Sequence, residues 1–213
     1  EDLVSEAERL VDSGVKELAL VSQDTMRYGA DIYGRPRLVD LIEALLEIKR
    51  LAWLRLHYTY PSGWREELID LLANEERLCG YVDMPIQHIS DPVLKAMRRG
   101  TTERSIRSLV NRLRDRIPHL VLRTSVIVGF PGETETDFDA LSDFIREIRF
   151  ERLGVFQYSS EEGTPAGLMV DSVSEEVKHS RLEQLMDIQR EVSMDINGGL
   201  VGHRFNVLID SES

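Results

Sequence analysis

Short apolar runs alternate with longer helical patterns along most of the chain. Apolar runs typical of strands occur at residues 18–22, 53–58, 81–84, 120–128 and 153–156. Helical spacing of apolar residues fills the gaps, at 5–13, 38–50, 64–74, 91 onward, 102–117 and 134–148. Strand starts about 30 to 40 residues apart, each separated by a helix, are typical of right-handed βαβ units. The pattern predicts an α/β fold with a parallel sheet.

The stretch from Leu122 to Thr134 is the most informative part of this pattern. Val126–Val128 are β-branched or apolar neighbours without polar alternation, which predicts a strand covered on both faces. The glycines and proline of Gly129–Gly132 end the strand, and the capping-box spacing of Thr134 and Asp137 opens a helix. Ligands bind at such strand-to-helix edges in α/β folds. A tight turn without a ligand fits the local pattern equally well.

Other residues predict where helices begin and end. Asp91 has the position of an N-cap with proline at the first helical position, and Thr102 opens the next helix. A long helix is expected at 174–197, ending at two glycines. Residues 201–209 predict a further strand without a partner in the preceding pattern. Because the chain opens on a helix, we also expect at least one strand and its loop upstream.

Polar residues follow or lie within all five predicted strands. Because parallel strands share one carboxyl edge, these groups are expected along a single rim, as in a barrel-type active site. Each has a plainer alternative: Asp24 closes a turn, His57 is a buried core histidine, or His88 orients its own loop. The residues are Ser22, Gln23, Asp24, Thr25, His57, Tyr58, Tyr60, Gln87, His88, Arg123, Thr124, Ser125, Tyr158, Ser159 and Ser160.

Composition narrows the class of protein. With 213 residues and 42% hydrophobic content, the chain is long enough for one substantial core. Its 38 acidic and 26 basic residues give a formal charge of −12, which argues against broad nucleic-acid binding through this segment. The arginines at 98–116 are interpreted as solvated helix faces. Neither a membrane-length apolar run nor a leader pattern is visible, so we expect a cytoplasmic protein.

Common catalytic and metal-binding motifs are mostly absent from the sequence. Cys79 is the single cysteine, which excludes a disulfide framework and an all-cysteine metal site built by this chain. Its apolar neighbours favour a buried thiol over a nucleophile. The sequence has no phosphate-loop lysine after Gly129–Gly132, no Gly-x-Ser-x-Gly elbow and no histidine pair with metal spacing. The residues alone therefore indicate an α/β ligand-binding enzyme and no more.

Four strings of residues, at 20–29, 83–90, 122–134 and 153–165, follow one another along almost the whole chain. In this order they resemble the corresponding strings of radical S-adenosylmethionine (SAM) methylthiotransferases. The resemblance implies an open (βα)6 partial TIM barrel that holds SAM and a 4Fe-4S cluster, with a second cluster in an N-terminal domain and a C-terminal TRAM domain. Residues 1–199 are then the core domain, and 200–213 begin the TRAM domain.

The first and last strings, with Ser-Gln-Asp-Thr at 22–25 and Glu-Glu-Gly-Thr-Pro at 161–165, are most similar to the RimO branch of that family. That branch implies modification of the β-carbon of an aspartate in ribosomal protein S-twelve, through a radical that abstracts hydrogen before a methylthio group is inserted. The implied partners are ribosomal protein S-twelve or the small ribosomal subunit, together with an electron donor.

The family's cluster loop, with three cysteines after the first barrel strand, has no counterpart in this sequence. Thiolates are the required cluster ligands, so we expect this chain to bind no metal by itself and to be inactive alone. Cys79 does not match a cluster position.

The resemblance also implies roles for individual residues, although the catalytic residue stays unassigned. Arg123 is expected at the methionyl carboxylate of SAM and Ser125 at its ribose. Glu133 is expected to stabilise the following helix N-terminus. The full set comprises Gln23, Asp24, Arg123, Ser125, Ile127, Val128 and Gly129 for SAM, and His57, Gln87, His88 and Tyr158 for the lumen or substrate.

Three alternatives remain open. A transfer RNA adenosine methylthiotransferase of the MiaB type shares the cofactors but has a nucleic-acid substrate. The acidic charge and the string at 22–25 favour the protein-modifying branch. A ribosome-docking module without chemistry, and a barrel enzyme without a cluster, are the other two.

Overall fold

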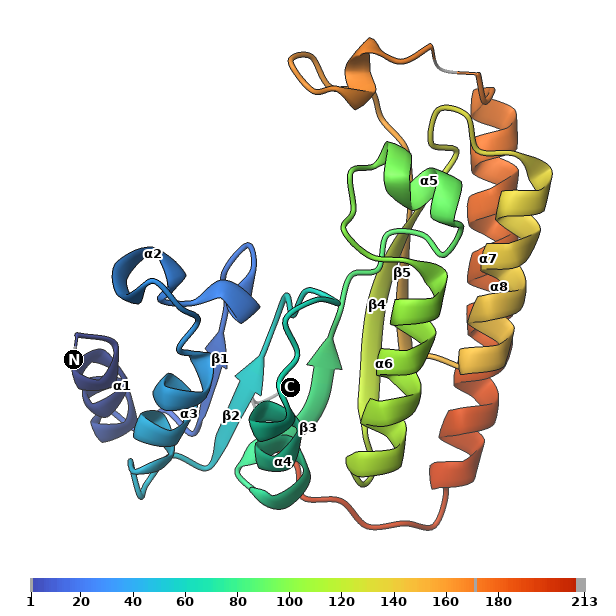
Figure 1. Cartoon of the computed structure of the whole chain (residues 1–213). Coiled ribbons are helices and arrows are strands. Elements are labelled where there is room, and N and C mark those ends of the chain that lie inside the picture. The colour runs from blue at the N-terminus through green and yellow to red at the C-terminus, as the bar shows by residue number, and fades with distance from the viewer. Residues whose placement is uncertain (1, 171, 210–213) are drawn as a thin grey trace.

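In the computed structural model, which describes residues 2–170 and 172–209, five parallel strands form one sheet in chain order (Figure 1). This confirms the predicted α/β class and the position of every predicted strand before residue 200. The observed strands differ from the predicted ones by up to three residues at an end. They are β1 (Glu17–Leu20), β2 (Trp53–Leu56), β3 (Leu78–Asp83), β4 (Val121–Val128) and β5 (Arg152–Gln157).

Helices cover one face of the curved sheet, and the other face stays open (Figure 1). We call the open face the lumen face. None of the helices in the described part of the chain is long and apolar enough to cross a membrane. The helices are α1 (Asp2–Asp12), α2 (Ala30–Tyr33), α3 (Leu38–Leu46), α4 (Glu66–Asn74), α5 (Asp91–Ala96), α6 (Glu103–Arg116), α7 (Glu135–Ile148) and α8 (Glu175–Leu200), with short 3-10 turns η1 (Thr25–Arg27) and η2 (Ala166–Leu168).

Strand β4 shows how the two faces differ. Its even-numbered side chains, Leu122 to Val128, are fully buried beneath the helices, whereas its odd-numbered side chains are half-buried on the lumen face. The prediction that this strand is covered on both faces was therefore wrong for Ile127. A closed core lies on one side only, and side chains two residues apart on the other side are available to a ligand.

Helix starts confirm two of the predicted caps and correct a third. Thr102 and Thr134 both form capping boxes, with Ser105 and Asp137 respectively. The N-cap of α5 is Ser90, not Asp91. The Asp91 carboxylate instead accepts a hydrogen bond from the backbone N of Glu103 at 2.7 Å, which ties α5 to the start of α6.

The C-terminal prediction was only partly right. Helix α8 continues through Gly198 and Gly199 to Leu200 rather than ending before them. Residues 203–209 are extended coil with exposed side chains, and no strand forms at 201–209, because no strand in the described ranges pairs with this segment. That 200–213 begins a TRAM domain stays a prediction, and residues 210–213 lie outside the described residues.

Candidate functional site

The strand register places four polar side chains in one row across the lumen face. Leu56 is opposite Val82, so His57 follows beside Asp83. Asp83 is opposite Arg123, which in turn is opposite Arg152. We call His57, Asp83, Arg123 and Arg152 the lumen row. It crosses the sheet where β2 and β3 end, while β4 and β5 continue beyond it.

Asp83 is the centre of the lumen row. Its side chain is 1% exposed, and Oδ1 accepts a hydrogen bond from Arg123 Nη1 at 2.6 Å while Oδ2 lies 3.2 Å from His57 Nδ1. Burial alone would lower the pKa of Arg123, but the hydrogen bond and charge of Asp83 outweigh it and raise that pKa. Arg123, predicted to bind the methionyl carboxylate, is therefore already paired with a carboxylate of the protein.

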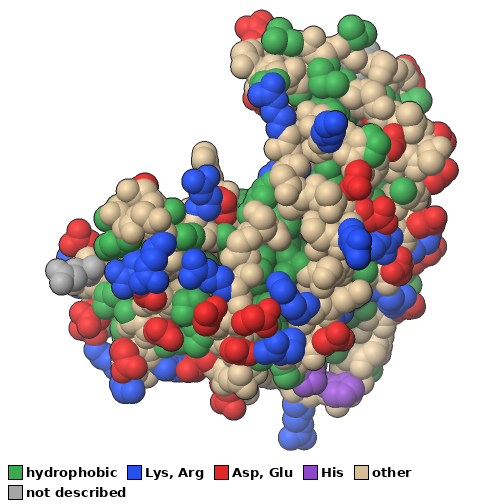
Figure 2. Space-filling view, in the orientation of Figure 1, with side chains coloured by type: hydrophobic (Ala, Val, Ile, Leu, Met, Phe, Trp, Pro, Cys, Tyr) green, Lys and Arg blue, Asp and Glu red, His purple; other side chains and the backbone are tan. Residues whose placement is uncertain are grey.

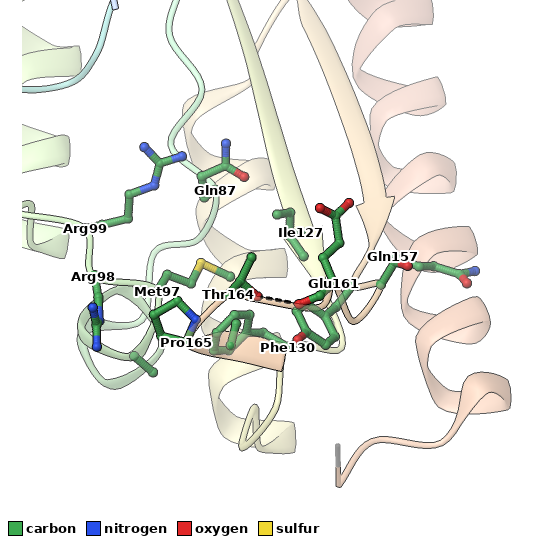
Figure 3. Close-up of a pocket in the computed structure, with 14 residues that line it drawn as sticks. Gln87, Met97, Arg98, Arg99, Ile127, Phe130, Gln157, Glu161, Thr164 and Pro165 are labelled. Atoms are coloured by element: carbon green, nitrogen blue, oxygen red, sulfur yellow. Dashed lines mark hydrogen bonds between the residues drawn. The ribbon is translucent and has the colours of Figure 1, made fainter. Parts of the chain in front are cut away.

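A cavity of about 530 Å³ lies beyond the lumen row, at the carboxyl ends of β4 and β5 (Figure 3). Gln87 enters it from the loop after β3 with a left-handed φ of 70°. The Gln87 backbone N donates to Ser125 O at 3.0 Å, and its O accepts from Ile127 N at 2.8 Å. This bridge to β4 sets the strained loop residue beside Ile127.

Tyr158 closes the far side of the cavity. Its backbone N donates to Val128 O at 2.9 Å, and its ring packs edge-on against Phe130 with centroids 5.1 Å apart. The Tyr158 hydroxyl oxygen is buried and has no hydrogen-bond partner among the described residues. A buried polar atom without a partner is costly, so this hydroxyl points to a ligand or an ordered water in the cavity.

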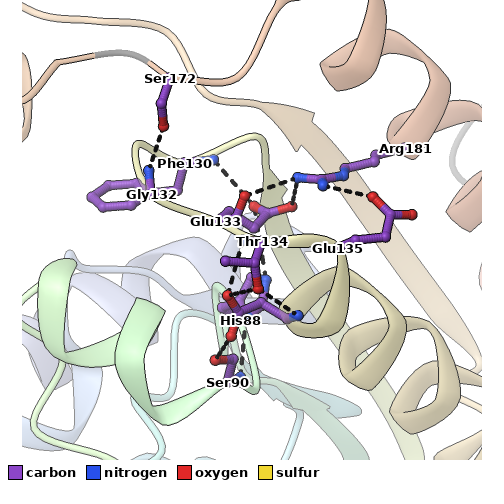
Figure 4. Close-up of polar contacts among 10 residues, drawn as sticks. His88, Ser90, Phe130, Gly132, Glu133, Thr134, Glu135, Ser172 and Arg181 are labelled. Atoms are coloured by element: carbon purple, nitrogen blue, oxygen red, sulfur yellow. Dashed lines mark hydrogen bonds and ion pairs between the residues drawn. The ribbon is translucent and has the colours of Figure 1, made fainter.

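Gln87 and His88 are adjacent in sequence, but their side chains lie in different parts of the structure. The His88 side chain is fully buried, away from the lumen, and its Nδ1 accepts a hydrogen bond from Ser90 N at 3.0 Å (Figure 4). The Ser90 hydroxyl donates to Asp137 at the start of α7. Burial lowers the pKa of His88 to about 4, so the ring is neutral at physiological pH. The alternative that His88 orients its own loop describes this structure.

Glu133 and Arg181 form a buried ion pair behind that loop (Figure 4). Arg181 Nη1 lies 2.7 Å from Glu133 Oε1, and its Nη2 lies 2.9 Å from Glu135 Oε2. Glu133 Oε2 accepts from Phe130 N at 3.1 Å, which closes the glycine–proline loop. Burial raises the pKa of Glu133 and the Arg181 charge opposes that rise. Glu133 thus fixes the loop to α8 rather than acting only at the N-terminus of α7.

The structure gives less direct support for the other residues that were predicted to bind the cofactor. Gln23 is exposed, and Asp24 caps η1 by accepting from Met26 N at 3.1 Å, which is its turn-closing alternative. The Val128 side chain is buried on the helix side of the sheet and does not line the cavity. Gly129 has a φ of 73°, and a Cβ there would collide with Lys178. Packing by itself therefore explains why position 129 is a glycine.

Sequence reasoning missed several residues on the lumen face. Tyr81 lies on the same face as Asp83, and Arg55 stacks on its ring at 4.8 Å. The odd-numbered alternation at 79–83 was the available signal. Cys79 shares this face and is half-buried, and burial raises its pKa, which disfavours the reactive thiolate.

The arginine-rich stretch divides into two parts. On α6, four arginines pair with carboxylates, for example Arg107 with Glu103 and Glu147 at 2.8 and 2.7 Å. This supports their interpretation as solvated helix faces. Arg98 and Arg99 instead line the cavity (Figure 3).

The donor set of the described residues does not fit a metal cluster. No group of three or more His, Cys, Asp or Glu side chains within 2–170 and 172–209 could hold a metal ion. Cys79 is the single cysteine of the sequence, and a 4Fe-4S cluster takes several thiolates. These residues by themselves therefore do not supply the ligands of such a cluster.

The chain is similar in sequence to known proteins along its whole length. The model of the Radical SAM superfamily matches residues 1–145. A protein named ribosomal protein uS12 methylthiotransferase RimO from Trichlorobacter lovleyi is 53% identical over 213 residues, which cover 100% of this chain and 47% of that protein. The protein of the same name from Clostridioides difficile is 47% identical, over 100% of this chain and 48% of its own length. The chain thus spans about half the length of these relatives.

Solved structures share the fold. The coproporphyrinogen III oxidase HemN from Escherichia coli, titled a radical SAM enzyme, matches 90% of this chain and 46% of its own with a TM-score of 0.63 at 19% identity. The radical SAM methyltransferase TsrM from Kitasatospora setae, solved with cobalamin and a 4Fe-4S cluster, covers 78% of this chain and 32% of its own with a TM-score of 0.59 at 24% identity. These likenesses confirm the predicted partial TIM-barrel fold class.

Proposed function

The chain belongs to the radical SAM superfamily, and from that membership we propose that it is the central part of a methylthiotransferase acting on an aspartate of ribosomal protein uS12. The observation that carries the proposal is identity of 47–53% along the whole chain to relatives bearing that name. The string at 22–25 and the net charge of −12 support a protein substrate over transfer RNA.

The cavity fits SAM. Its volume of about 530 Å³ is in the range of small-molecule sites, and it combines an apolar wall with polar groups at its edges. Ile127 and Phe130 supply apolar surface, Gln87 an amide, and Tyr158 a buried hydroxyl without a partner. The backbone of 127–129 is our candidate for the adenine, with Ser125 for the ribose.

Arg123 is our candidate for binding the methionyl carboxylate, because its side chain is 35% exposed even though it is hydrogen-bonded to Asp83. Guanidinium groups bind carboxylates through paired hydrogen bonds. Gln23 and Asp24, at the end of β1, complete the proposed cofactor set at the methionyl amine.

When bound by these residues, SAM would supply the radical chemistry for which the superfamily is named. The residues of this chain bind and orient rather than react. Gln87, held by two backbone hydrogen bonds to β4, fixes one side of the cavity. Ile127 and Phe130 exclude water from the other side, which protects a reactive species. Electron delivery and cluster binding are assigned to parts of the protein outside this sequence.

We further propose that the protein works in the cytoplasm, where ribosomal protein uS12 or the small ribosomal subunit is the substrate and an electron donor is the second partner. The hollow in the face shown in Figure 2, between the α2 side and the taller side that carries α5 to α8, is the route by which a substrate loop reaches the lumen face.

Mass spectrometry of ribosomal protein uS12 from cells with and without the full-length gene tests the proposal. We expect the target aspartate to carry a methylthio group only when the gene is present, and re-expression to restore it. An aspartate that is unmodified in both strains contradicts the assignment. Transfer RNA hydrolysed from the same cells and examined for methylthioadenosine separates the nucleic-acid alternative.

A further inference from the structure

Three arginines share the lumen face with Tyr81. The Arg55 guanidinium carbon lies 4.8 Å from the centroid of the Tyr81 ring. Burial and the Asp83 charge raise the pKa of the Tyr81 hydroxyl, while the charges of Arg123, Arg55 and Arg152 act to lower it. The parallel register puts Arg152 opposite Arg123, which is opposite Asp83, so Arg152 lies on the same face of the sheet as Tyr81 and Asp83.

The carboxylates of the protein neutralise only two of these cations. Glu17 Oε1 lies 2.5 Å from Arg55 Nε, and Asp83 pairs with Arg123 at 2.6 Å. Arg152 Nη1 donates to the backbone O of Glu151 at 2.8 Å, and no carboxylate of the described residues lies within 4.0 Å of its guanidinium. The neighbouring Glu151 carboxylate pairs with Arg114 instead. Arg152 is left as an unmatched cation.

The position of this unmatched charge costs stability. Arg152 is directly opposite Arg123 in the β4–β5 register, and like charges in opposite positions destabilise a sheet. The Tyr81 hydroxyl also has no hydrogen bond to another described residue. A guanidinium and a phenol O–H on the same face of the sheet, neither of them paired with a carboxylate, are donors that an incoming carboxylate can use.

The position of Arg152 and Tyr81 along their strands suits a substrate that lies below the cofactor cavity. Arg152 precedes Gly154 by two residues and Phe156 by four, and these are opposite Ser125 and Ile127. At about 3.3 Å per residue, Arg152 lies roughly 7 Å below the Ser125 row and roughly 13 Å below the Ile127 row. Gly154 has no side chain to fill the space between.

We propose that Arg152 and Tyr81 bind the side-chain carboxylate of the substrate aspartate, with Arg123 reinforcing the positive field. This inference rests on the proposed function and names the specificity site for its substrate. The acid group is held at the lumen row, and the adjoining carbon is directed toward the cavity that receives SAM. Asparagine at the target position lacks the charge and is bound less well.

The test uses the full-length protein with its clusters reconstituted, SAM, and a peptide of ribosomal protein uS12 that contains the target aspartate. We expect Arg152→Gln and Tyr81→Phe each to raise the KM for the peptide roughly 10- to 100-fold, the range for a lost charged hydrogen bond. The KM for SAM should not change. Arg152→Lys, which keeps the charge, should recover part of the loss. Arg146→Gln on α7, whose arginine pairs with Asp143 on the surface, is the matched control and should match wild type.

Binding of the aspartate peptide and of its asparagine variant, followed by fluorescence anisotropy, is the second readout. Wild type should prefer aspartate, and Arg152→Gln should bind both peptides equally. A raised KM for SAM with an unchanged KM for the peptide assigns the site to the cofactor carboxylate and overturns the proposal. Unchanged constants, or an unaltered aspartate preference in correctly folded variants, also overturn it. A wild-type enzyme that binds the peptide but never modifies it contradicts the proposed function, and the anisotropy comparison then still decides the role of Arg152.

Discussion

Two arginine–carboxylate pairs show how the same interaction serves different purposes on the two sides of β4. Arg181 and Glu133 lie on the helix side with side chains 6% and 0% exposed. Arg123 and Asp83 lie on the lumen face, where the arginine is 35% exposed and the carboxylate 1%. The first pair is closed to solvent and fixes a loop. The second has a buried anion and a cation that a ligand can still reach.

The difference follows from where the compensating hydrogen bonds come from. Glu133 is satisfied by Arg181 and the Phe130 backbone, so its surroundings leave no room for an incoming group. Asp83 is satisfied by Arg123 and His57, but Arg123 keeps unpaired donors on its exposed side. A buried ion pair is costly to break, whereas a half-exposed one can exchange partners at low cost. Ligand binding is therefore expected at the lumen row and rigidity at the Glu133 loop.

The largest expected effect comes from breaking the buried pair. Arg181→Met leaves the Glu133 carboxylate buried without a cation, which should lower the free energy of unfolding by about 3–5 kcal/mol. Urea unfolding of the full-length protein measures it. Arg190→Met on the same helix, whose arginine pairs with Asp187 at the surface, is the control and should change stability by about 0.5 kcal/mol or less. Equal effects of the two substitutions would remove the contrast between the pairs.

The next prediction uses the pH dependence of stability to distinguish the loop that contains His88 from the lumen row. Burial lowers the pKa of His88 from 6.5 to about 4, while the Asp137 charge opposes the shift and that of Arg181 adds to it. As pH falls from about 6.5 to about 4, His88 is therefore protonated in the unfolded chain while it is still neutral in the folded protein. The corresponding loss of unfolding free energy is roughly 3 kcal/mol.

His88→Asn keeps an acceptor for Ser90 N and removes the titration. The difference in unfolding free energy between pH 7 and pH 4.5, measured for both proteins, should be smaller in the variant. The raised pKa of Glu133 acts in the opposite direction and is common to both proteins. A variant with the same pH slope as wild type would show that His88 is not the group responsible.

A smaller effect is expected from breaking the lumen pair. Arg123→Gln leaves Asp83 with His57 as its remaining side-chain partner, and we expect unfolding free energy to fall by about 1–2 kcal/mol, less than for Arg181→Met. The same variant should raise the KM for SAM, since Arg123 is our candidate for the methionyl carboxylate. Calorimetric titration of the reconstituted protein with SAM checks this part, and an unaltered affinity would contradict that role.

The smallest change in stability is expected at the cavity. Tyr158→Phe removes a buried hydroxyl that has no partner among the described residues, so unfolding free energy should change by about 0.5 kcal/mol or less. SAM affinity should nevertheless fall several-fold if the hydroxyl binds the cofactor. Phe130→Leu, which trims an apolar wall and keeps the hydroxyl, is the comparison. A marked loss of stability in Tyr158→Phe would instead indicate an ordered water on that oxygen.

Local patterns in the sequence were enough to predict the five strands of the sheet and the capping boxes of two helices, but not the N-cap of α5 or the absence of a strand at 201–209. Thr102 and Thr134 lie at fixed spacings from their partners, so their caps are local features. Of the lumen row, His57 and Arg123 were expected along the rim, but Asp83 and Arg152 could not be predicted. The neighbours of Asp83 are set by strand register, and Arg152 comes from a strand 69 positions later in the sequence. Gln87 and His88 were paired in the prediction because they are adjacent, and a positive φ at Gln87 sends them in different directions.

Helix α8 determines the distance between the cavity and the C-terminal segment. It begins beside the Glu133 loop, where Arg181 lies, and runs antiparallel to the strands for 26 residues (Figure 1). At 1.5 Å per residue it is about 39 Å long, so residues 201–209 leave at the edge where the strands begin. The helix therefore separates residues 201–209 from the cavity by the height of the sheet. Its length keeps the C-terminal segment away from the edge at which we propose that the cofactor binds.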